Sequence, residues 1–285
     1  GLAKEAGLYL DKEEAEEVAV PELAANPVTR FGDVWLCGDH RVMCGDSTKA
    51  ECVNTLLKGA VPFMMVTDPP YGVAYDPEWR DGVDLGIGER SRGKVQNDDI
   101  VDWTEAYRLF PGDVAYVWHS SQFCIEVGKN LMEAGFIIRA SIFWAKQHFA
   151  ISRGHYHWQH EPCWYTVRKG KVAKWCGDRT QSTMWQIANN NAFGGDGEDK
   201  FGHGTQKPIE CMARPIRNHG DQNDAIYDPF IGSGTSLIAG FQLDRKVYGM
   251  DIDPKYVDCT LERFFGYATI EPTLEATGQT FSQVK

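Results

Sequence analysis

Short runs of hydrophobic residues alternate with amphipathic segments along the chain from residue 34 onward. The runs have the length of buried strands, and the segments between them place apolar residues on one helical face. Strands are expected at 34–43 (a pair turned at Gly38-Asp39), 61–67, 114–118, 136–144, 225–230 and 246–251. Helices are expected at 48–59 (begun by a Thr48–Glu51 capping box), 100–110, 122–134, 208–219, 235–241 and from Asp253-Pro254 onward. Strands that alternate with helices predict an α/β fold with a doubly wound, mostly parallel sheet.

Three segments interrupt this alternation. Residues 1–33 are acidic and contain prolines, so they are interpreted as a linker or the trimmed edge of a longer chain. Residues 73–98 are polar and glycine-rich, which is typical of a long mobile loop. Residues 147–202 lose the pattern and are interpreted as an inserted lobe. The expected boundaries are therefore 34–146 and 203–270 for the two halves of one domain, with 271–285 as a tail.

Composition excludes several classes of protein. The 285 residues are 42% hydrophobic and 24% charged, as in an ordinary globular chain. No apolar stretch approaches the roughly 20 residues of a membrane span, and the acidic start is unlike a secretory leader. The eight cysteines include no C-x-x-C pair. Reduced thiols in the cytoplasm are therefore expected, rather than a disulfide framework or a metal site.

Charge is distributed unevenly along the chain. The net charge of −11 by itself argues against a nucleic-acid partner. Residues 135–180, however, hold eight basic and two acidic residues together with four tryptophans. Basic charge mixed with aromatic rings is typical of a groove for a polyanion with stackable bases. A solvated face around core tryptophans is the alternative interpretation of the same pattern.

One strand end carries residues that suit a nucleotide. Residues 228–235, Asp-Pro-Phe-Ile-Gly-Ser-Gly-Thr, lead from a strand through a glycine-rich turn into a helix. Such a turn lets the backbone approach a ligand closely, and free amides at the helix start favour a negative group. Asp251 ends the following strand, where a carboxylate suits a ribose hydroxyl pair. Leu237 breaks the G-x-G-x-x-G pattern, which disfavours NAD.

A second strand end carries Asp68-Pro69-Pro70-Tyr71. The two prolines remove two backbone donors and leave carbonyl groups and a carboxylate as acceptors. Acceptors closed off by an aromatic ring suit a planar ring that bears an exocyclic amine. A rigid turn after a buried strand is the alternative interpretation.

These motifs resemble those of amino-group DNA methyltransferases. Residues 68–71 are similar to the catalytic motif of that family, and residues 228–235 are similar to its S-adenosylmethionine motif. Residues 203–208, His-Gly-Thr-Gln-Lys-Pro, resemble the H-x-T-Q-K-P element of one subgroup. The catalytic motif precedes the cofactor motif, as in the circularly permuted β arrangement. The start of the domain also resembles methyltransferases that are joined to a ParB-like domain. A missing ParB-like N-terminal domain is therefore one of the expected partners that the sequence leaves open.

The resemblance implies a permuted class I S-adenosylmethionine-dependent methyltransferase fold in which residues 147–202 form a target-recognition lobe. It implies a bacterial or phage enzyme that methylates N6 of adenine, flipped out of double-stranded DNA, with S-adenosylmethionine as cofactor. Asp at the first motif position favours adenine. Methylation of cytosine N4 and a non-catalytic DNA-binding module that keeps the fold are the alternatives. A homodimer on a palindromic site is also open.

The resemblance assigns roles to individual residues. The catalytic residues are expected to be Asp68, Pro69, Pro70 and Tyr71, with Asp68 and the Pro69 carbonyl accepting hydrogen bonds from the amine and Tyr71 stacking on the base. The expected cofactor-binding residues are Asp46, Asp68, Thr205, Lys207, Asp228, Phe230, Gly232, Ser233, Gly234, Thr235, Asp251 and Ile252. The expected DNA-binding residues are Lys146, Arg153, Arg168, Lys169 and Lys171. Glu161 is interpreted as the partner of a nearby arginine in preference to a pocket residue.

Overall fold

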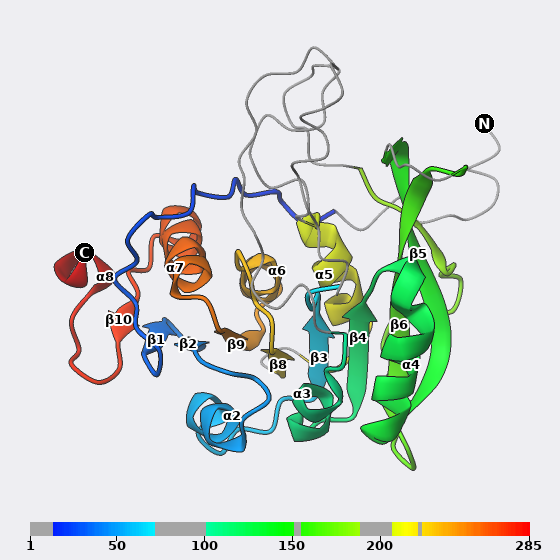
Figure 1. The fold of residues 1–285 in the computed structure, drawn as a ribbon, viewed down its shortest axis with the longest axis horizontal. Helices are drawn as coiled ribbons and strands as arrows, with labels where there is room; N and C mark the ends of the chain where they lie inside the picture. Colours follow the sequence, from blue (N-terminus) through cyan, green and yellow to red (C-terminus); the bar gives the residue numbers. More distant parts are fainter. Residues whose placement is uncertain (1–13, 72–100, 151–154, 189–206, 222–223) are drawn as a thin grey trace.

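The computed structural model describes residues 14–71, 101–150, 155–188, 207–221 and 224–285 (Figure 1). A ten-stranded sheet runs through it in the order β10-β1-β2-β9-β8-β3-β4-β6-β5-β7. The strands are β1 Val34–Cys37, β2 His40–Cys44, β3 Met64–Thr67, β4 Val114–Trp118, β5 Phe136–Ala150, β6 Trp158–Arg168, β7 Met184–Gln186, β8 Ala225–Asp228, β9 Lys246–Asp251 and β10 Thr273–Leu274. The helices are α2 Ala50–Leu57, α3 Thr104–Leu109, the 3-10 turn η2 Ser121–Phe123, α4 Cys124–Glu133, α5 Ile209–Arg217, α6 Thr235–Gln242, α7 Pro254–Ala268 and α8 Phe281–Val284.

Helices cover both faces of the sheet. Figure 1 shows α5, α6 and α7 on one face and α2, α3 and α4 on the other. The buried side chains form two clusters that match these layers: Ile209, Leu237 and Leu261 belong to the first, and Leu56 and Leu131 to the second. The predicted doubly wound α/β fold is confirmed.

The central strands are parallel and buried. β2, β9, β8, β3 and β4 pair in parallel, each with its neighbour. All residues of β3 and β4 are buried, which explains why their sequences are continuous apolar runs rather than alternating ones. The carboxyl ends of these strands meet at one edge of the sheet, where ligands bind in open α/β folds.

The order of the strands differs from their order in the chain. β8 and β9 come late in the sequence but lie between β2 and β3. The ends of β9 and β2 are joined by a hydrogen bond from Gly45 N to the carbonyl of Asp251 at 2.8 Å. The ends of β3 and β8 are joined by Thr67 Oγ1, which donates to Asp228 Oδ1 at 2.6 Å. Both predicted motif loops therefore leave the sheet at the same edge.

The boundary expected at residue 147 is wrong for the described part of that region. β5 continues to Ala150, and β6 lies within the main sheet between β4 and β5. β6 is antiparallel to β4, with Cys163 opposite Trp118 and Val167 opposite Val114. Exposed and buried residues come in pairs along β6 instead of alternating. That pairing is why the period-2 signal of a strand is missing from its sequence.

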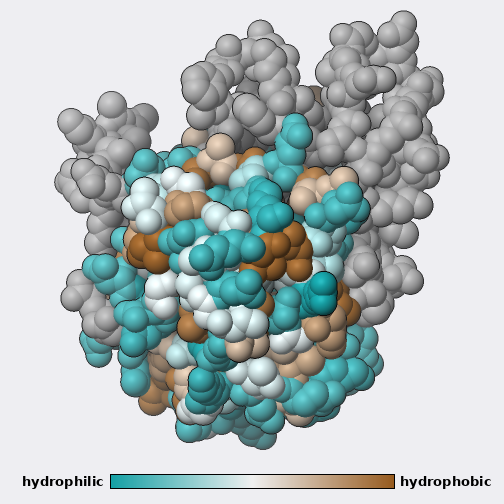
Figure 2. All heavy atoms as spheres, turned by 90° about the vertical axis from the view of Figure 1, so that its left-hand side faces the viewer, coloured by the Kyte–Doolittle hydropathy of each residue, from teal (hydrophilic) through white to brown (hydrophobic). Residues whose placement is uncertain are grey.

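The described ends of the chain also belong to the fold, so their interpretation as a linker and a tail is corrected. In the acidic segment, Val28 N and Thr29 N donate to the carboxylate of Asp258 at 2.7 and 3.2 Å. At the other end, β10 pairs antiparallel with β1, and Phe281 packs edge-on against Trp35 with ring centroids 5.4 Å apart. Figure 2 views the molecule from the left-hand side of Figure 1, where β10 and α8 lie. On this side the described residues form a mainly hydrophilic surface with small hydrophobic groups.

The sequence predicted the start of one helix correctly and the cap of another incorrectly. The capping box expected at α2 is absent, because α2 has no side-chain cap, and Thr48 instead donates from N and Oγ1 to Asp46 Oδ1 at 2.9 and 2.7 Å. At α7 the prediction is confirmed: Asp253 accepts from Lys255 N, and Pro254 occupies the first turn.

Some expectations fall outside the described residues, namely the loop at 73–98, Arg153 and Thr205. In the part of the chain that the structure describes, no helix has the length and hydrophobicity that crossing a membrane requires.

Candidate active site

The floor of the site is the junction between β3 and β8. Asp228, at the end of β8, is buried and accepts three hydrogen bonds: Thr67 Oγ1 and Phe230 N donate to Oδ1, and Ser236 Oγ donates to Oδ2 at 2.5 Å. Burial is the main cause that raises the pKa of Asp228, to about 6. Both oxygens of this predicted cofactor residue are thus engaged within the chain, where they brace the glycine turn.

The turn that follows β8 requires glycine. Gly232 and Gly234 have φ values of +53° and +82°, in the left-handed region. A Cβ at Gly234 would lie 2.9 Å from Cγ2 of Thr260 on α7. The turn delivers Thr235 to the start of α6, where the first amides of the helix have no side-chain cap. The absence of a Cβ at Gly234 therefore lets α7 pack closely against the turn, and the close approach of a ligand to this backbone stays a prediction.

Asp251 stands beside this turn. Its Oδ2 accepts a hydrogen bond from Gly232 N at 3.1 Å, and its Oδ1 accepts one from Asp253 N at 2.9 Å. Burial is the main cause that raises the pKa of Asp251, to about 7. The structure also brings Asp46 and Ile252 here, since Gly45 N bonds the Asp251 carbonyl and Cys44 Sγ contacts the Ile252 carbonyl.

A compact cluster of charges lies after β3. Nζ of Lys207 lies 2.7 Å from Oδ2 of Asp68, 2.8 Å from Oε2 of Glu161 and 2.5 Å from the Tyr71 hydroxyl. Nζ of Lys146 lies 2.5 Å from Oε1 of Glu161. The members come from four parts of the fold: the turn after β3, strands β5 and β6, and the residue pair before α5.

The electrostatics of this cluster are set by burial and by the ion pairs. Burial lowers the pKa of Lys207, but Asp68 and Glu161 outweigh it and the net shift is upward. Burial raises the pKa of Glu161, but Lys207 and Lys146 outweigh it and hold the value at about 2. For Asp68 burial dominates: its pKa is raised, Glu161 adds to the rise, and Lys207 opposes it. Lys207 is therefore a fixed cation between two carboxylates.

The two oxygens of Asp68 have different surroundings. Oδ2 accepts from Lys207, whereas Oδ1 is buried and has no hydrogen-bond partner among the described residues. A buried acceptor without a donor is costly, and most such groups in native proteins have a structural or functional reason. Oδ1 is thus an open acceptor at the carboxyl edge of the sheet.

Trp103 joins the two motif loops and was missed from the sequence. Its Nε1 donates to the Pro70 carbonyl at 3.2 Å, and its ring packs edge-on against Phe230 with centroids 4.7 Å apart. The side chain is only 5% exposed. No local signal marks this role, because Trp103 precedes a short helix in a stretch of mixed polarity.

The structure adds contacts to one residue of the expected site and overturns the role expected for another. The binding of the cofactor by Lys207 stays a prediction, and the ammonium group of Lys207 contacts Asp68, Tyr71 and Glu161. Glu161 was expected to pair with an arginine, and this is wrong: its partners are Lys207 and Lys146, and it lies in the site. These contacts join residues that are far apart in the chain, so neither spacing nor residue type could reveal them.

The four expected DNA-binding residues that the structure describes do not lie together. Lys146 is at the edge of the charge cluster. Arg168 lies at the opposite edge of the sheet, near the start of β4, and donates to the carbonyls of Phe110, Gly112 and Ala134. Its guanidinium group is therefore committed to the fold. Lys169 and Lys171 follow it in the turn after β6, away from Asp68.

The glycine turn, the carboxylate on the adjacent strand and the neighbouring acceptor cluster define an S-adenosylmethionine-dependent methyltransferase. The residues fit that cofactor, because a Cβ at Gly232 would meet no described atom nearer than the Phe230 carbonyl oxygen at 4.0 Å, so that part of the turn is open, and Asp251 offers its carboxylate at the next strand end. Residues 63–262 match the DNA methylase family N6_N4_Mtase, and the chain belongs to this family. It is therefore a DNA methyltransferase.

Relatives and solved structures agree with this assignment. The type II methyltransferase M2.MboI of Moraxella bovis is 26% identical over 231 residues, which are 74% of this chain and 82% of that protein. M2.LlaDCHI of Lactococcus lactis subsp. cremoris is 28% identical over 232 residues, 72% of this chain and 83% of that protein. The M1.HpyAVI–SAM complex has a similar fold, with a TM-score of 0.56, 21% identity and coverage of 78% of this chain and 98% of that chain. The cytosine-N4-specific PvuII DNA methyltransferase is similar at a TM-score of 0.54 and 16% identity, covering 85% of this chain and 90% of that chain.

Proposed function

We propose that this chain is a site-specific DNA adenine-N6 methyltransferase of the permuted β type, which acts on an adenine flipped out of double-stranded DNA. The observation that carries the proposal is the divided role of the Asp68 carboxylate. Lys207 occupies Oδ2, and Oδ1 is buried without a donor among the described residues. An N–H of an exocyclic amine would supply the missing donor.

The cluster addresses the weakness of the amine as a nucleophile. The lone pair of this nitrogen is delocalised into the base, so it attacks poorly while the amine is planar. Asp68 Oδ1 and the Pro69 carbonyl would each accept one N–H, which favours a pyramidal nitrogen. When bound, S-adenosylmethionine would supply an electrophilic methyl group: the new N–C bond would replace the S–C bond, S-adenosylhomocysteine would leave as a neutral thioether, and the amine would release one proton to solvent. The contribution of these residues is positioning and electrostatics.

Lys207 and Tyr71 both support this geometry. Lys207 favours the ionised form of Asp68, which is the form that accepts hydrogen bonds through both oxygens. The Tyr71 hydroxyl accepts from Lys207 at 2.5 Å and donates to Glu161 at 3.3 Å, which fixes the end of the ring. We infer that the ring stacks on the flipped base.

The choice of adenine over cytosine rests on Asp at the first position of the motif, as usage in the resembling family implies. Both bases present an exocyclic amine beside a ring nitrogen, so the open acceptor alone fits either. The product of the reaction therefore decides between N6 of adenine and N4 of cytosine.

DNA approaches from the carboxyl edge of the sheet in this proposal. Lys146 lies at that edge with its side chain 19% exposed, so it is the described cation best placed to meet a phosphate near the flipped base. Arg168 is withdrawn as a phosphate contact because three carbonyl groups engage it. We infer that the enzyme acts in the bacterial cytoplasm, where its substrate lies.

The test is methyl transfer from labelled S-adenosylmethionine to unmethylated duplex DNA, followed by digestion to nucleosides. Wild-type protein should place label in N6-methyl-2′-deoxyadenosine. Asp68→Asn should lower kcat by about 10³-fold or more, as expected for loss of an interaction made in the transition state, with cofactor affinity within a few fold. Asp113→Asn, at the opposite edge of the sheet, is the matched control and should keep full activity.

The other outcomes have defined meanings. Label in N4-methylcytosine would keep the mechanism and overturn the choice of base. Near-normal turnover by Asp68→Asn would refute the role of Asp68. Saturable cofactor binding without transfer to any DNA would favour a non-catalytic module that keeps the fold.

A further inference from the structure

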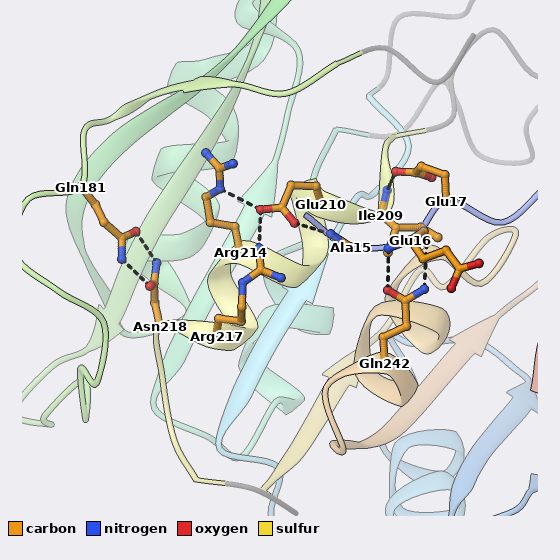
Figure 3. Close-up of polar contacts among 10 residues, drawn as sticks. All are labelled: Ala15, Glu16, Glu17, Gln181, Ile209, Glu210, Arg214, Arg217, Asn218 and Gln242. Atoms are coloured by element: carbon orange, nitrogen blue, oxygen red, sulfur yellow. Dashed lines mark hydrogen bonds and ion pairs between the residues drawn. The ribbon is translucent and has the colours of Figure 1, made fainter. Parts of the chain in front are cut away.

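The acidic N-terminal segment touches the helical face of the domain at a point that the proposed mechanism does not use. We call residues 15–18 the N-terminal strap. Figure 3 shows the strap beside the first turn of α5 and the end of α6. Glu16 N donates to Gln242 Oε1 at 3.1 Å, and Gln242 Nε2 donates back to the Glu16 carbonyl at 2.8 Å. The strap is thus held in place by its backbone.

The strap supplies the cap that α5 lacks. The residue before α5 is Pro208, which provides no side-chain cap. Glu17 Oε1 instead accepts from Ile209 N, the first amide of the helix, at 2.7 Å. Ala15 N donates to Glu210 Oε2 at 3.0 Å. A carboxylate at a helix start satisfies an amide without a partner and interacts favourably with the helix dipole.

This cap lies close to the active site along the chain. Lys207 is two residues before Ile209, and Pro208 restricts the backbone between them. The Lys207 side chain is 2% exposed and reaches Asp68 at 2.7 Å. A shift at the start of α5 therefore moves Lys207 relative to the carboxylate that it holds.

The strap also contacts the support of the cofactor turn. Arg263, on α7, donates through Nη2 to the Val18 carbonyl at 2.7 Å and through Nη1 to the Ser233 carbonyl at 3.1 Å. The side chain of Arg263 is buried. Burial lowers the pKa of Arg263 to about 10, and the negative charge of Glu17 opposes part of this fall. Glu17 and Val18 therefore bridge the start of α5, which follows Lys207, and the loop that carries Gly232 and Gly234.

We propose that Glu17 is a positioning residue for methyl transfer: by capping α5 it fixes Lys207 against Asp68, and the strap keeps that pair in register with the cofactor turn. This inference rests on the proposed function for its kinetic consequence, but its structural claim concerns Lys207 alone. Glu17 does not touch the reacting atoms and acts through Lys207.

Two substitutions separate this role from a general contribution to stability. Glu17→Ala removes the acceptor for Ile209 N. Glu17→Gln keeps an oxygen at the same place, because an amide carbonyl also accepts a hydrogen bond. Glu14→Ala, an exposed acidic residue just before the strap, is the matched control for loss of one negative charge.

The first measurement is steady-state methyl transfer well below the midpoint of thermal unfolding. Glu17→Ala should lower kcat about tenfold, which corresponds to about 1.4 kcal/mol, with the KM for DNA within about twofold. Glu17→Gln should recover kcat to within about twofold of wild type, as should Glu14→Ala. A kcat of Glu17→Ala within twofold of wild type, or a loss as large in Glu17→Gln as in Glu17→Ala, would overturn the inference.

The second measurement does not depend on catalysis. Acetylation of Lys207 by acetic anhydride is followed by peptide mass spectrometry, with the exposed Lys58 as internal reference. Lys207 should react about tenfold faster in Glu17→Ala than in wild type or Glu17→Gln, because local opening governs the reactivity of a buried amine. Equal protection in all variants would refute the positioning role even in a protein that transfers no methyl. Increased reactivity in a protein without transfer would refute the proposed function and leave the link between Glu17 and Lys207 in place.

Discussion

Replacing Lys207 by methionine tests the centre of the site, because it removes one cation from between two carboxylates. Nζ of Lys207 lies 2.7 Å from Asp68 and 2.8 Å from Glu161, and the lysine side chain is 2% exposed. Two unit charges 4 Å apart interact by about 4 kcal/mol at an effective dielectric constant of 20. Breaking a buried ion pair by removing one partner costs about 3–5 kcal/mol. Since the carboxylates are 25% and 22% exposed, we expect a loss near the lower figure.

Urea unfolding of the Lys207→Met variant measures this loss, with Lys58→Met as the matched control. Lys58 pairs with Glu275 at 2.7 Å, but its side chain is 69% exposed. An exposed pair of this kind contributes about 0–1 kcal/mol. Adding Glu161→Gln to Lys207→Met removes one of the two facing carboxylates and should recover about 1–2 kcal/mol. Equal destabilisation by Lys207→Met and Lys58→Met would refute the electrostatic account of the cluster.

The same variant has a kinetic signature. Burial raises the pKa of Asp68 and Lys207 opposes that rise, so removal of the lysine raises the pKa further. Among the described residues, the groups with the largest effect on the pKa of Asp68 are Lys207, Glu161 and Tyr71, and Lys207 is the cation of this set. The acid limb of the pH profile of kcat/KM should therefore move to higher pH in Lys207→Met, so that activity lost at pH 7 returns in part at pH 9. An unmoved acid limb would contradict this role.

Three further substitutions probe the rest of the site. Gly234→Ala places a Cβ 2.9 Å from Thr260 Cγ2 at a residue with φ of +82°, so thermal unfolding should show a loss of about 1–2 kcal/mol and calorimetry a weaker cofactor affinity. Burial raises the pKa of Asp251 from 3.8 to about 7, so the folded state binds this proton more tightly than the unfolded chain and stability falls as pH rises through that window. Asp251→Asn should remove that part of the fall, so the free energy of unfolding of the variant relative to wild type should be higher at pH 8 than at pH 4. The variant should also bind the cofactor more weakly. A difference in stability from wild type that does not depend on pH would contradict the shift. Trp103→Phe keeps the ring against Phe230 but loses the donor to the Pro70 carbonyl, so we expect about 1 kcal/mol of destabilisation and a reduced kcat, checked by unfolding and single-turnover kinetics.

Local signals explain what the sequence could predict. Continuous apolar runs marked β3 and β4, and the side-chain cap followed by proline marked the start of α7. The two motif loops could also be found from the sequence, because each consists of consecutive residues next to a strand. Turns and caps depend on a few neighbouring residues, so single-sequence patterns capture them.

Contacts between distant residues account for what could not be predicted. Tyr71 and Glu161 are 90 positions apart, and Asp68 and Lys207 are 139 apart. The meeting of Tyr71 with Glu161 depends on β6 lying beside β4, and the paired pattern of burial along β6 hid that strand. Arg168 was misjudged for a related reason: its charge suggested a phosphate contact, but its place near the start of β4 gives it backbone carbonyls to bind.

The position of Lys207 imposes a condition on the whole site. The cofactor carries a positive sulfonium, and an uncompensated lysine in a buried site nearby would repel it, since the attraction or repulsion of unit charges grows as water is excluded. Asp68 neutralises Lys207 through Oδ2, while its Oδ1 stays available to the amine. Glu161 also pairs with Lys207, and Lys146 in turn balances Glu161 from the edge of the site. The two carboxylates and the two lysines therefore carry no net charge together, and Glu161 helps to hold Lys207 in place although it lies on a strand that carries neither motif.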